Sequence, residues 1–227
     1  MKNLQNIFIV ENKGCDNMSV LILLGGATAS GKSTLGHNLQ NNISNSIMYR
    51  RYQGFFDIAK EKGIAKKDVF SMITPEEVDN WYVDICKNND VVISDIHYAI
   101  QMDRKEGNTN PSIDIYQNYV PTISMDLLQK LNNEGVKVIA IFLDCSPKEC
   151  LKRALERHNR INKELRNISE EDALIERNSE MFEWKRLLST GFVEGIELNS
   201  EVYSTDQLTD ECLEYLTNLK SVVLELK

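Results

Sequence analysis

The sequence lacks an excess of basic residues and has no long apolar run. Its 26 Lys and Arg residues are outnumbered by 34 Asp and Glu residues, which gives a formal net charge of -8. An acidic chain attracts phosphate backbones or anionic lipid only through a local basic patch, so this balance disfavours nucleic-acid binding. No stretch approaches the roughly 18 apolar residues that span a bilayer, which disfavours membrane insertion. We expect a cytoplasmic protein whose partner is a small molecule.

The sequence also lacks a cysteine framework. Its five cysteines are odd in number and scattered, with no CxxC pair and no histidine nearby at metal-ligand spacing. Disulfides and a structural zinc site are therefore not expected. The residues concerned are Cys15, Cys86, Cys145, Cys150 and Cys212.

The chain is predicted to form one domain preceded by a short appendage. Met18 begins the segment "MSVLILLGG", which is typical of the start of a protein chain. Residues 1–17 are therefore interpreted as either an extra edge strand or a mis-called start. A chain of 227 residues with 42% hydrophobic content can bury a full core within one compact unit. We expect that unit to span residues 18–227.

Short apolar segments alternate with helical segments along this domain. The sequence "TPEE" at 74–77 is typical of a capping box with proline at the first helical position, and "SPKE" at 146–149 repeats the pattern. The alternation predicts an α/β fold of three layers around a central parallel sheet of about five strands. The segments predicted as strands are 19–24, 91–95, 136–144 and 192–198.

The segment "GGATASGKST" (25–34) contains a phosphate-binding motif. It satisfies the pattern GxxxxGK(S/T), a predicted buried strand precedes it, and leucines at a spacing of four follow it. Glycines let backbone N–H groups turn toward phosphate oxygens, lysine reaches the terminal phosphates, and the serine hydroxyl joins a Mg²⁺ shell. The motif predicts binding of ATP and Mg²⁺ by Gly26, Ala27, Thr28, Ala29, Ser30, Gly31, Lys32, Ser33 and Thr34.

Asp95 ends the predicted strand "VVISD" and is the candidate for a second element of the site. Ligands of parallel sheets bind beyond the carboxyl ends of the strands, so Asp95 should emerge beside the loop. There it would hold Mg²⁺ together with Ser33, partly through water, or accept a hydroxyl proton. His97, two residues later, is either a substrate contact or a structural residue.

Three arginines share one face of the helix predicted after "SPKE". Arg153, Arg157 and Arg160 fall at i, i+4 and i+7, as a lid that closes over phosphates requires. The alternative is a solvated face with Glu149–Arg153 and Glu156–Arg160 pairs, each worth about 0.2–0.5 kcal/mol. That alternative leaves Arg157 without an acidic partner four residues earlier. We predict a small helical lid at about 153–170, with Arg177 from the next helix beside it.

Taken together, these residues resemble the P-loop kinase superfamily, and in particular the archaeal-type adenylate kinases. The resemblance runs from about residue 19 to 219 and rests on the loop motif, the Asp-x-His of "VVISDIH", the lid entry "LKRALERHNR" and "IERNSEM". It implies catalytic roles for Arg153, Arg160 and Arg177 and places Asp95 and His97 on family positions. The loop motif and the shared helix face make Lys32 and Arg157 catalytic candidates as well, and Asp95 is one by its place at the strand end. The resemblance also implies that "TGFVEGIELN" leads to Asn199 near the adenine pocket.

The acceptor side departs from this family. Ser71 stands where family members usually place an arginine that holds the phosphate of AMP. Arg50 and Arg51, in "YRRYQGFF", are either replacement charges for the substrate or an exposed pair. The resemblance therefore specifies the donor side of the site more closely than the acceptor side.

These observations predict an ATP-dependent kinase that moves the γ-phosphoryl group of Mg-ATP to a nucleotide or nucleoside-like small molecule. A kinase for a non-nucleotide metabolite is the alternative among enzymes. An ATP-hydrolysing switch or assembly factor is the alternative from another functional class. A nucleic-acid end kinase is disfavoured by the acidic balance.

Overall fold

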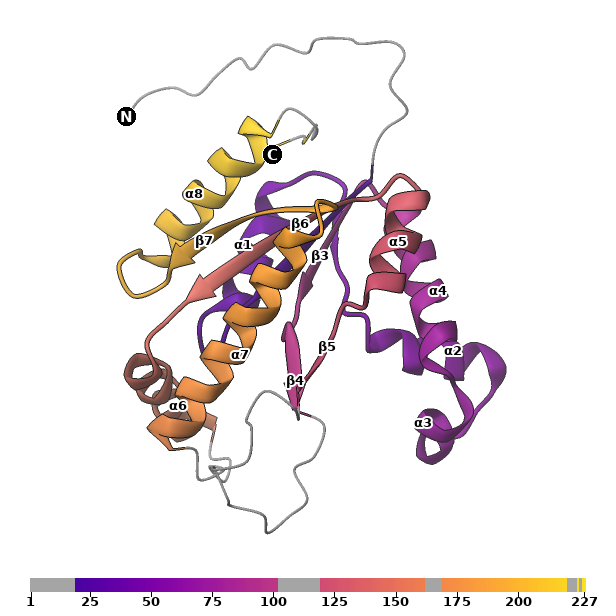
Figure 1. Cartoon of the computed structure of the whole chain (residues 1–227), viewed down its shortest axis with the longest axis horizontal. Helices are drawn as coiled ribbons and strands as arrows, with labels where there is room; N and C mark the ends of the chain where they lie inside the picture. The colour runs from indigo at the N-terminus through magenta and orange to yellow at the C-terminus, as the bar shows by residue number, and fades with distance from the viewer. Residues whose placement is uncertain (1–18, 102–118, 162–168, 220–223, 225) are drawn as a thin grey trace.

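A five-stranded parallel sheet forms the centre of the protein. The computed structural model describes residues 19–101, 119–161, 169–219, 224, 226 and 227. Every pairing in the sheet is parallel, and the strand order is β2-β3-β1-β6-β7, with β1 in the middle (Figure 1). The bounds are β1 (Val20–Gly25), β2 (Ser46–Met48), β3 (Val91–Asp95), β6 (Lys137–Asp144) and β7 (Val193–Asn199).

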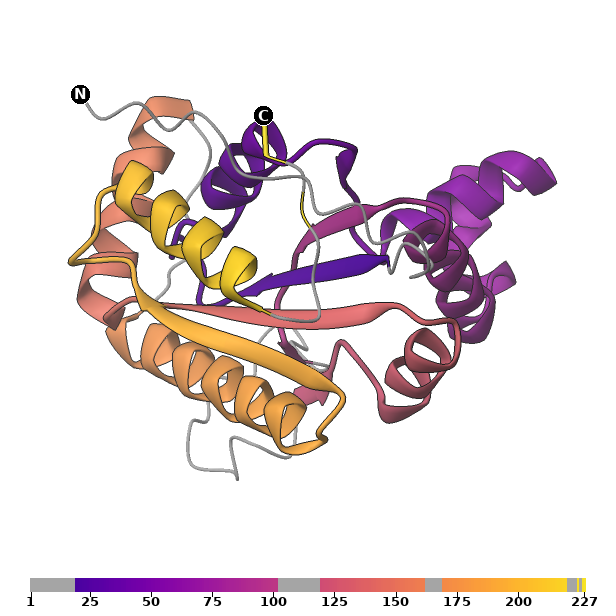
Figure 2. The same cartoon turned by 90° about the horizontal axis from the view of Figure 1, so that it is seen from above.

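Helices cover both faces of the sheet, which gives the three predicted layers (Figure 2). Helices α1 and α8 lie on one face, and α4, α5 and α7 lie on the other. Helices α2 and α3, together with the start of α4, form an arm (Figure 1). The bounds are α1 (Lys32–Asn42), α2 (Gln53–Lys62), the short helix η1 (Lys66–Asp68), α3 (Val69–Met72), α4 (Pro75–Lys87), α5 (Met125–Asn133), α6 (Pro147–Ile161), α7 (Glu170–Ser189) and α8 (Thr205–Asn218).

The central strand shows why the sheet is covered on both faces. Successive side chains of a strand point to opposite faces, and all of those from Val20 to Leu24 are apolar. Leu21 and Leu23 pack against α4, α5 and α7, whereas Ile22 and its even-numbered neighbours pack against α1 and α8. None of these strand residues is more than 1% exposed. An apolar strand without alternation therefore becomes the most buried element of the fold.

The predicted strands and the observed ones agree except where the segments are very short. The four predicted strands correspond to β1, β3, β6 and β7 with ends that match or differ by one residue, and the expectation of about five strands in three layers is confirmed. The strand β2 was not predicted, because it has only three residues and is half-buried. An antiparallel pair, β4 (Ala99–Gln101) with β5 (Tyr119–Pro121), was not predicted either.

The two predicted capping boxes have different outcomes. The first is confirmed, since the Thr74 hydroxyl accepts from the Glu77 N–H and the Glu77 carboxylate accepts from the Thr74 N–H. The second is wrong for one of its two hydrogen bonds. The Ser146 hydroxyl does accept from the Glu149 N–H at 3.3 Å, but the Ser146 N–H donates to Glu201. Glu149 instead pairs with residues one turn further along α6.

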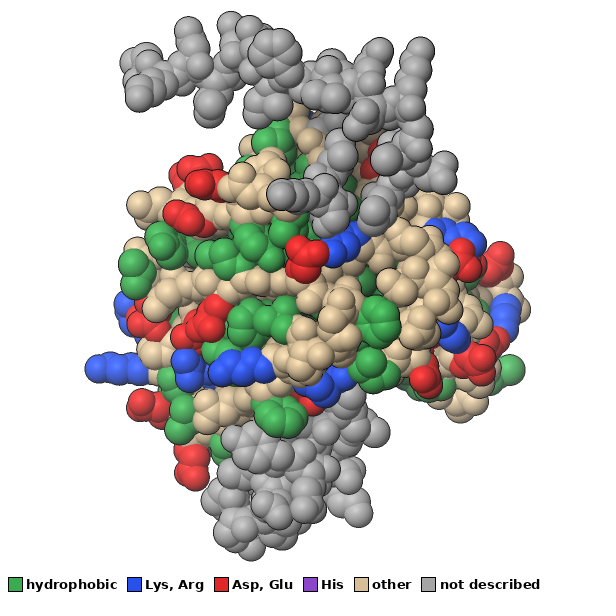
Figure 3. Space-filling model, turned by 45° about the horizontal axis from the view of Figure 1, so that its top comes forward, with side chains coloured by type: hydrophobic (Ala, Val, Ile, Leu, Met, Phe, Trp, Pro, Cys, Tyr) green, Lys and Arg blue, Asp and Glu red, His purple; other side chains and the backbone are tan. Residues whose placement is uncertain are grey.

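Some predictions fall on parts of the chain that the structure does not describe. These are the appendage at 1–17 and the lid from 162 to 168. No helix in the described ranges is long and apolar enough to cross a membrane. Acidic and basic side chains are interspersed over the face of the molecule shown in Figure 3.

Candidate functional site

The loop between β1 and α1 has a backbone that only small residues fit. Gly26, Ala29 and Gly31 all have positive φ angles, of 136°, 66° and 105°. A Cβ atom on Gly26 would lie 2.4 Å from the carbonyl oxygen of Leu143, on the adjacent strand β6. Gly26 is therefore required by close approach as well as by conformation. The loop turns back tightly against the end of the sheet, as a phosphate-binding loop must.

Helix α1 begins directly after this loop with an uncapped N-terminus. Its N-cap is Gly31, no side chain caps it, and its first turn contains no acidic residue. The free N–H groups and the positive end of the helix dipole therefore favour an anion at this position. Inside the loop, the buried Ser30 hydroxyl has no hydrogen-bond partner among the described residues. These features fit the phosphates of a nucleotide.

Lys32 lies folded across the loop. Its Nζ donates to the carbonyl oxygens of Gly26 and Ala27, at 2.6 and 2.9 Å, and the residue is only 9% exposed. Burial lowers the pKa of its ammonium group, and the carboxylates of Glu180 and Glu176 oppose that change. The lysine is thus a buried cation at the centre of the site, held by carbonyl oxygens that phosphate oxygens can replace.

Asp95 emerges beside the loop because β3 is paired with β1. The Asp95 carboxylate accepts hydrogen bonds from the Ser33 hydroxyl at the start of α1 and from the Arg50 guanidinium. Burial acts to raise the pKa of Asp95, but the hydrogen bonds from Arg50 and Ser33 outweigh it and lower that pKa. Three segments far apart in sequence therefore meet at one carboxylate.

Ser33 and Asp95 are the described residues suited to Mg²⁺ in this site. A hydroxyl and a carboxylate are the oxygen ligands that Mg²⁺ takes in phosphoryl-transfer sites, where phosphate oxygens and water complete its shell. No cluster of three or more His, Cys, Asp or Glu suited to a metal occurs within the described ranges. The hydroxyl of Ser33 and the carboxylate of Asp95 fit a Mg²⁺ whose other ligands are phosphate oxygens and water, and the same carboxylate also accepts from Arg50.

Two glutamates of α7 contact the loop, and sequence reasoning missed both. Glu180 is fully buried and accepts from the N–H groups of Gly26 and Tyr98, at 3.3 and 2.8 Å. Glu176 accepts from the N–H and the hydroxyl of Thr28, at 3.0 and 2.7 Å. Their spacing of four puts them on one face of the helix. That spacing was the only signal in the sequence, and a solvated helix face has the same pattern.

His97 lies against these glutamates. Its Nδ1 is 3.0 Å from Oε1 of Glu180 and 3.4 Å from Oε1 of Glu176. The side chain is 41% exposed, whereas that of Glu180 is fully buried. A buried carboxylate thus orients a half-exposed imidazole at the edge of the loop, which places His97 among the residues of the site.

The predicted lid arginines have different surroundings. Arg153 donates to Glu149 at 3.0 Å and to the carbonyl oxygen of Ser200 at 2.7 Å, so it ties α6 to the end of β7. Arg157 is exposed and has no hydrogen bond or ion pair within the described chain. The backbone of Arg160 is helical, but its side chain lies outside the described structure.

Arg177 forms a two-point pair at the end of β6. Its Nε and Nη2 donate to the two carboxylate oxygens of Asp144, at 2.6 and 2.8 Å. The hydrogen bonds that Arg177 donates to Asp144 raise the pKa of Arg177, although burial opposes them. Asn199, at the end of the neighbouring strand β7, accepts from the N–H groups of Glu201 and Val202 and so shapes the turn that follows.

The candidate acceptor arginines are both occupied. Arg50 is paired with Asp95, and Arg51 is paired with Asp79 on α4. Ser71 lies in α3, where its hydroxyl donates to the carbonyl oxygen of Asp68. The structure therefore brings Arg50 to the loop and directs Arg51 into the arm.

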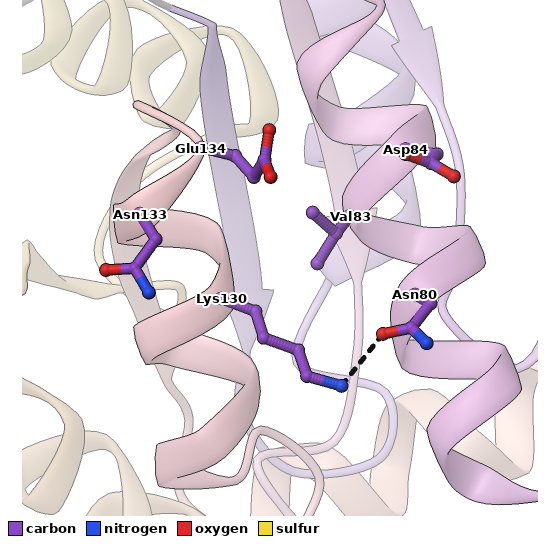
Figure 4. Close-up of a pocket in the computed structure, with 6 residues that line it drawn as sticks. All are labelled: Asn80, Val83, Asp84, Lys130, Asn133 and Glu134. Carbon is purple, nitrogen blue, oxygen red and sulfur yellow. Dashed lines mark hydrogen bonds between the residues drawn. The ribbon is translucent and has the colours of Figure 1, made fainter.

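A shallow groove of about 290 Å³ lies elsewhere, between α4 and α5 (Figure 4). Lys130 of α5 reaches across it to the side-chain oxygen of Asn80 on α4, at 2.8 Å. The groove shares no residue with the loop site, and its lining consists of Asn80, Val83, Asp84, Lys130, Asn133 and Glu134. It is a packing junction between two helices and contains none of the predicted site residues.

Comparisons with known proteins bear on the fold. No family model matches the chain, and no curated protein does. The chain is similar to a solved structure from the PezAT chromosomal toxin-antitoxin system of Streptococcus pneumoniae, with 14% identity and a TM-score of 0.50, over 90% of this chain and 79% of that one.

Two further solved structures are similar over most of their length. One is the tunicamycin resistance protein of Deinococcus radiodurans, with 12% identity and a TM-score of 0.46 over 91% of this chain and 98% of that one. The other is the deoxyadenosine kinase from M. mycoides, with 15% identity and a TM-score of 0.47 over 88% and 100%. The chain shares with them an α/β fold built on a central parallel sheet, here of five strands. At such low identities the likeness concerns the fold alone.

Proposed function

We propose that this protein transfers the γ-phosphoryl group of Mg-ATP to a small molecule, of the nucleotide or nucleoside-like class. The observation that carries the proposal is the strained loop with Lys32 across it, beside the Ser33–Asp95 pair. Backbone N–H groups and a buried ammonium group bind and position polyphosphate, and they stabilise the charge that spreads over the transferring oxygens.

The surrounding residues have defined roles in this proposal. Mg²⁺, when bound, neutralises charge on the β- and γ-phosphates. Lys32 exchanges its two carbonyl partners for phosphate oxygens, and the N-terminus of α1 holds the phosphates in place. Arg157, exposed on α6, is available to close over the transferring group. Arg153 and Arg177 have a structural role, because they hold α6 against the end of β7 and α7 against the end of β6.

A coupled ADP-release assay tests the proposal. Mg-ATP is supplied with and without a panel of nucleosides, nucleoside monophosphates and sugars, and turnover that depends on the acceptor is expected. Replacing Lys32 with Ala should lower that turnover about 100-fold or more, since losses of this size follow removal of a charge-stabilising donor. Turnover within about threefold of wild type in Lys32→Ala would refute a phosphotransferase site here. ADP release that no acceptor stimulates would instead favour an ATP-hydrolysing switch.

A further inference from the structure

Three carboxylates lie near Lys32, and they differ in whether a carboxylate oxygen is accessible to a substrate. Asp95, Glu176 and Glu180 all act electrostatically on its ammonium group. A kinase that phosphorylates a hydroxyl needs one positioned carboxylate or imidazole to take the hydroxyl proton. The hydrogen bonds of the three carboxylates decide which one can do so.

Both oxygens of Asp95 already accept hydrogen bonds, and two of the three donors are the N–H groups of a cation. Oδ1 accepts from Nε of Arg50, and Oδ2 accepts from Nη2 of Arg50 and from the Ser33 hydroxyl. These donors stabilise the carboxylate as an anion, which makes it a weak base. Asp95 is therefore suited to Mg²⁺ and to holding Arg50, and it is poorly suited to receive a proton.

Glu180 is inaccessible. It is fully buried, and its two oxygens are taken by the N–H groups of Gly26 and Tyr98 and by Nδ1 of His97. A substrate could reach this carboxylate only if the loop came apart. Glu180 therefore positions the start of the loop and the His97 ring.

Glu176 differs from both. One oxygen, Oε1, receives both hydrogen bonds from Thr28 and also faces Nδ1 of His97. The other oxygen, Oε2, has no hydrogen bond in the described structure, and the side chain is 24% exposed. Thr28 directly follows Ala27, whose carbonyl oxygen holds Nζ of Lys32. An oriented carboxylate with one free oxygen thus lies next to the lysine that binds the terminal phosphates.

The charges around this position favour a neutral acceptor. A phosphate acceptor is already anionic, needs no base, and would meet the carboxylates of Glu176 and Glu180. The two arginines on the acceptor side, Arg50 and Arg51, are each neutralised by an aspartate. A hydroxyl group is neutral, and its proton needs a base in order to leave.

We infer that Glu176 is the catalytic base and that the acceptor group is an alcohol hydroxyl, not a phosphate. This inference rests on the proposed phosphotransferase function. The hydroxyl proton moves to Oε2 of Glu176 as the hydroxyl oxygen forms a bond to the γ-phosphorus. The bond from that phosphorus to the β,γ-bridging oxygen breaks, and ADP leaves with its electron pair. Glu176 then releases the proton to water, so that ATP and an alcohol give ADP, a phosphate monoester and a proton.

The test compares Glu176→Gln with wild type on two sets of probes. The hydroxyl probes are adenosine, ribose and glycerol, and the phosphate probes are AMP, CMP and UMP, with products separated by anion-exchange chromatography. We expect phosphate monoesters from at least one hydroxyl probe and no nucleoside diphosphate from the phosphate probes. Glu176→Gln should lower kcat about 100-fold, as loss of a general base does, while the affinity for a fluorescent ATP analogue stays within about threefold.

Two further variants separate a base from a structural residue. Formate should restore part of the activity of Glu176→Ala, whereas chloride at equal ionic strength should not, because only formate supplies a carboxylate. Glu171→Gln, an exposed change in the first turn of α7, should act like wild type. Nucleoside diphosphate formation that survives Glu176→Gln would overturn the inference, and so would a panel on which no hydroxyl probe is phosphorylated. Those outcomes leave the proposed function standing as long as Lys32→Ala abolishes ADP release.

Discussion

The proposed donor side of the site and the arm are built in different ways. The donor side consists of β1, the loop and α1, and its strand residues are at most 1% exposed between two neighbouring strands. The arm, from α2 to α4, has a small cluster of its own, centred on Ile58, Val69 and Val78. Phe70 and Met72 in the arm are 69% and 60% exposed. The loop is therefore anchored in the main core, whereas the arm depends on a few local contacts.

Arg50 joins these two regions. It follows β2 and precedes the arm, and its guanidinium group binds Asp95 on the donor side. The hydrogen bonds that Arg50 donates to Asp95 raise the pKa of Arg50, although burial opposes them, so the arginine remains a cation. An arm that moves on binding its acceptor would carry this cation with it. The pair thus links the segment that leads into the arm with the proposed Mg²⁺ position.

The largest effect is expected from Asp95→Asn, which breaks this link on the donor side. The change keeps the shape and removes the charge, so kcat should fall about 100-fold while ATP affinity changes much less. ADP release and fluorescent-analogue binding measure the two quantities. Asp90→Asn, an exposed change in the turn before β3, is the control and should act like wild type.

The double variant Asp95→Asn with Arg50→Gln shows whether that loss of kcat comes from a lost metal ligand or from an unpaired Arg50. If the loss in Asp95→Asn came only from leaving Arg50 without its partner, then adding Arg50→Gln would restore kcat. We expect no restoration, because neither change returns a carboxylate to the metal position. Recovery to within about threefold of wild type would show that Asp95 serves the ion pair alone.

An intermediate effect is expected from Arg157→Ala on α6. Arg157 is exposed and unpaired within the described structure, so its loss should leave the melting temperature almost unchanged. If Arg157 closes over the phosphates, kcat/KM should fall about tenfold, equivalent to about 1.4 kcal/mol. Lys152→Ala, an exposed residue of the same helix, is the matched control. Equal kinetics for the two variants would leave Arg157 as ordinary surface charge.

The smallest effect on activity is expected from Glu77→Gln in the arm. The Lys62 ammonium group and the Thr74 cap lower the pKa of Glu77 to about 2. A folded-state pKa below the ordinary value of 4.5 means that this carboxylate stabilises the fold above about pH 4.5, and that the stabilisation is lost as the pH falls toward 2.

Thermal unfolding at pH 7 and pH 3 checks this prediction. Glu77→Gln should have a lower melting temperature than wild type at pH 7, and the difference should shrink at pH 3. Its kcat/KM should stay within about threefold of wild type, because the side-chain partners of Glu77 are Lys62 and Thr74, and neither belongs to the loop site. Glu61→Gln, an exposed change on α2, should show no such dependence on pH. A difference that grows at low pH would contradict the assignment.

The sequence by itself determined the loop, its flanking strand and helix, and the layered fold. Gly26, Gly31 and Lys32 are local requirements of one turn, and the apolar run of β1 can be buried only in the middle of a sheet. Asp95 could also be placed beside the loop, because strand ends of a parallel sheet share one edge. Local backbone chemistry and periodicity are properties of neighbouring residues, so both can be read from the chain.

Only the tertiary structure decided which charges meet. Glu176 and Glu180 are about 150 residues from the loop they contact, at sequence separations of 148 and 154. Arg50 and Asp95 are 45 residues apart, and Arg177 and Asp144 are 33 apart. A charged residue on a helix looks the same in sequence whether it faces water or a loop. Its partner is set by where α7 packs on the sheet and by where β3 lies within it, because an ion pair depends on distance in space.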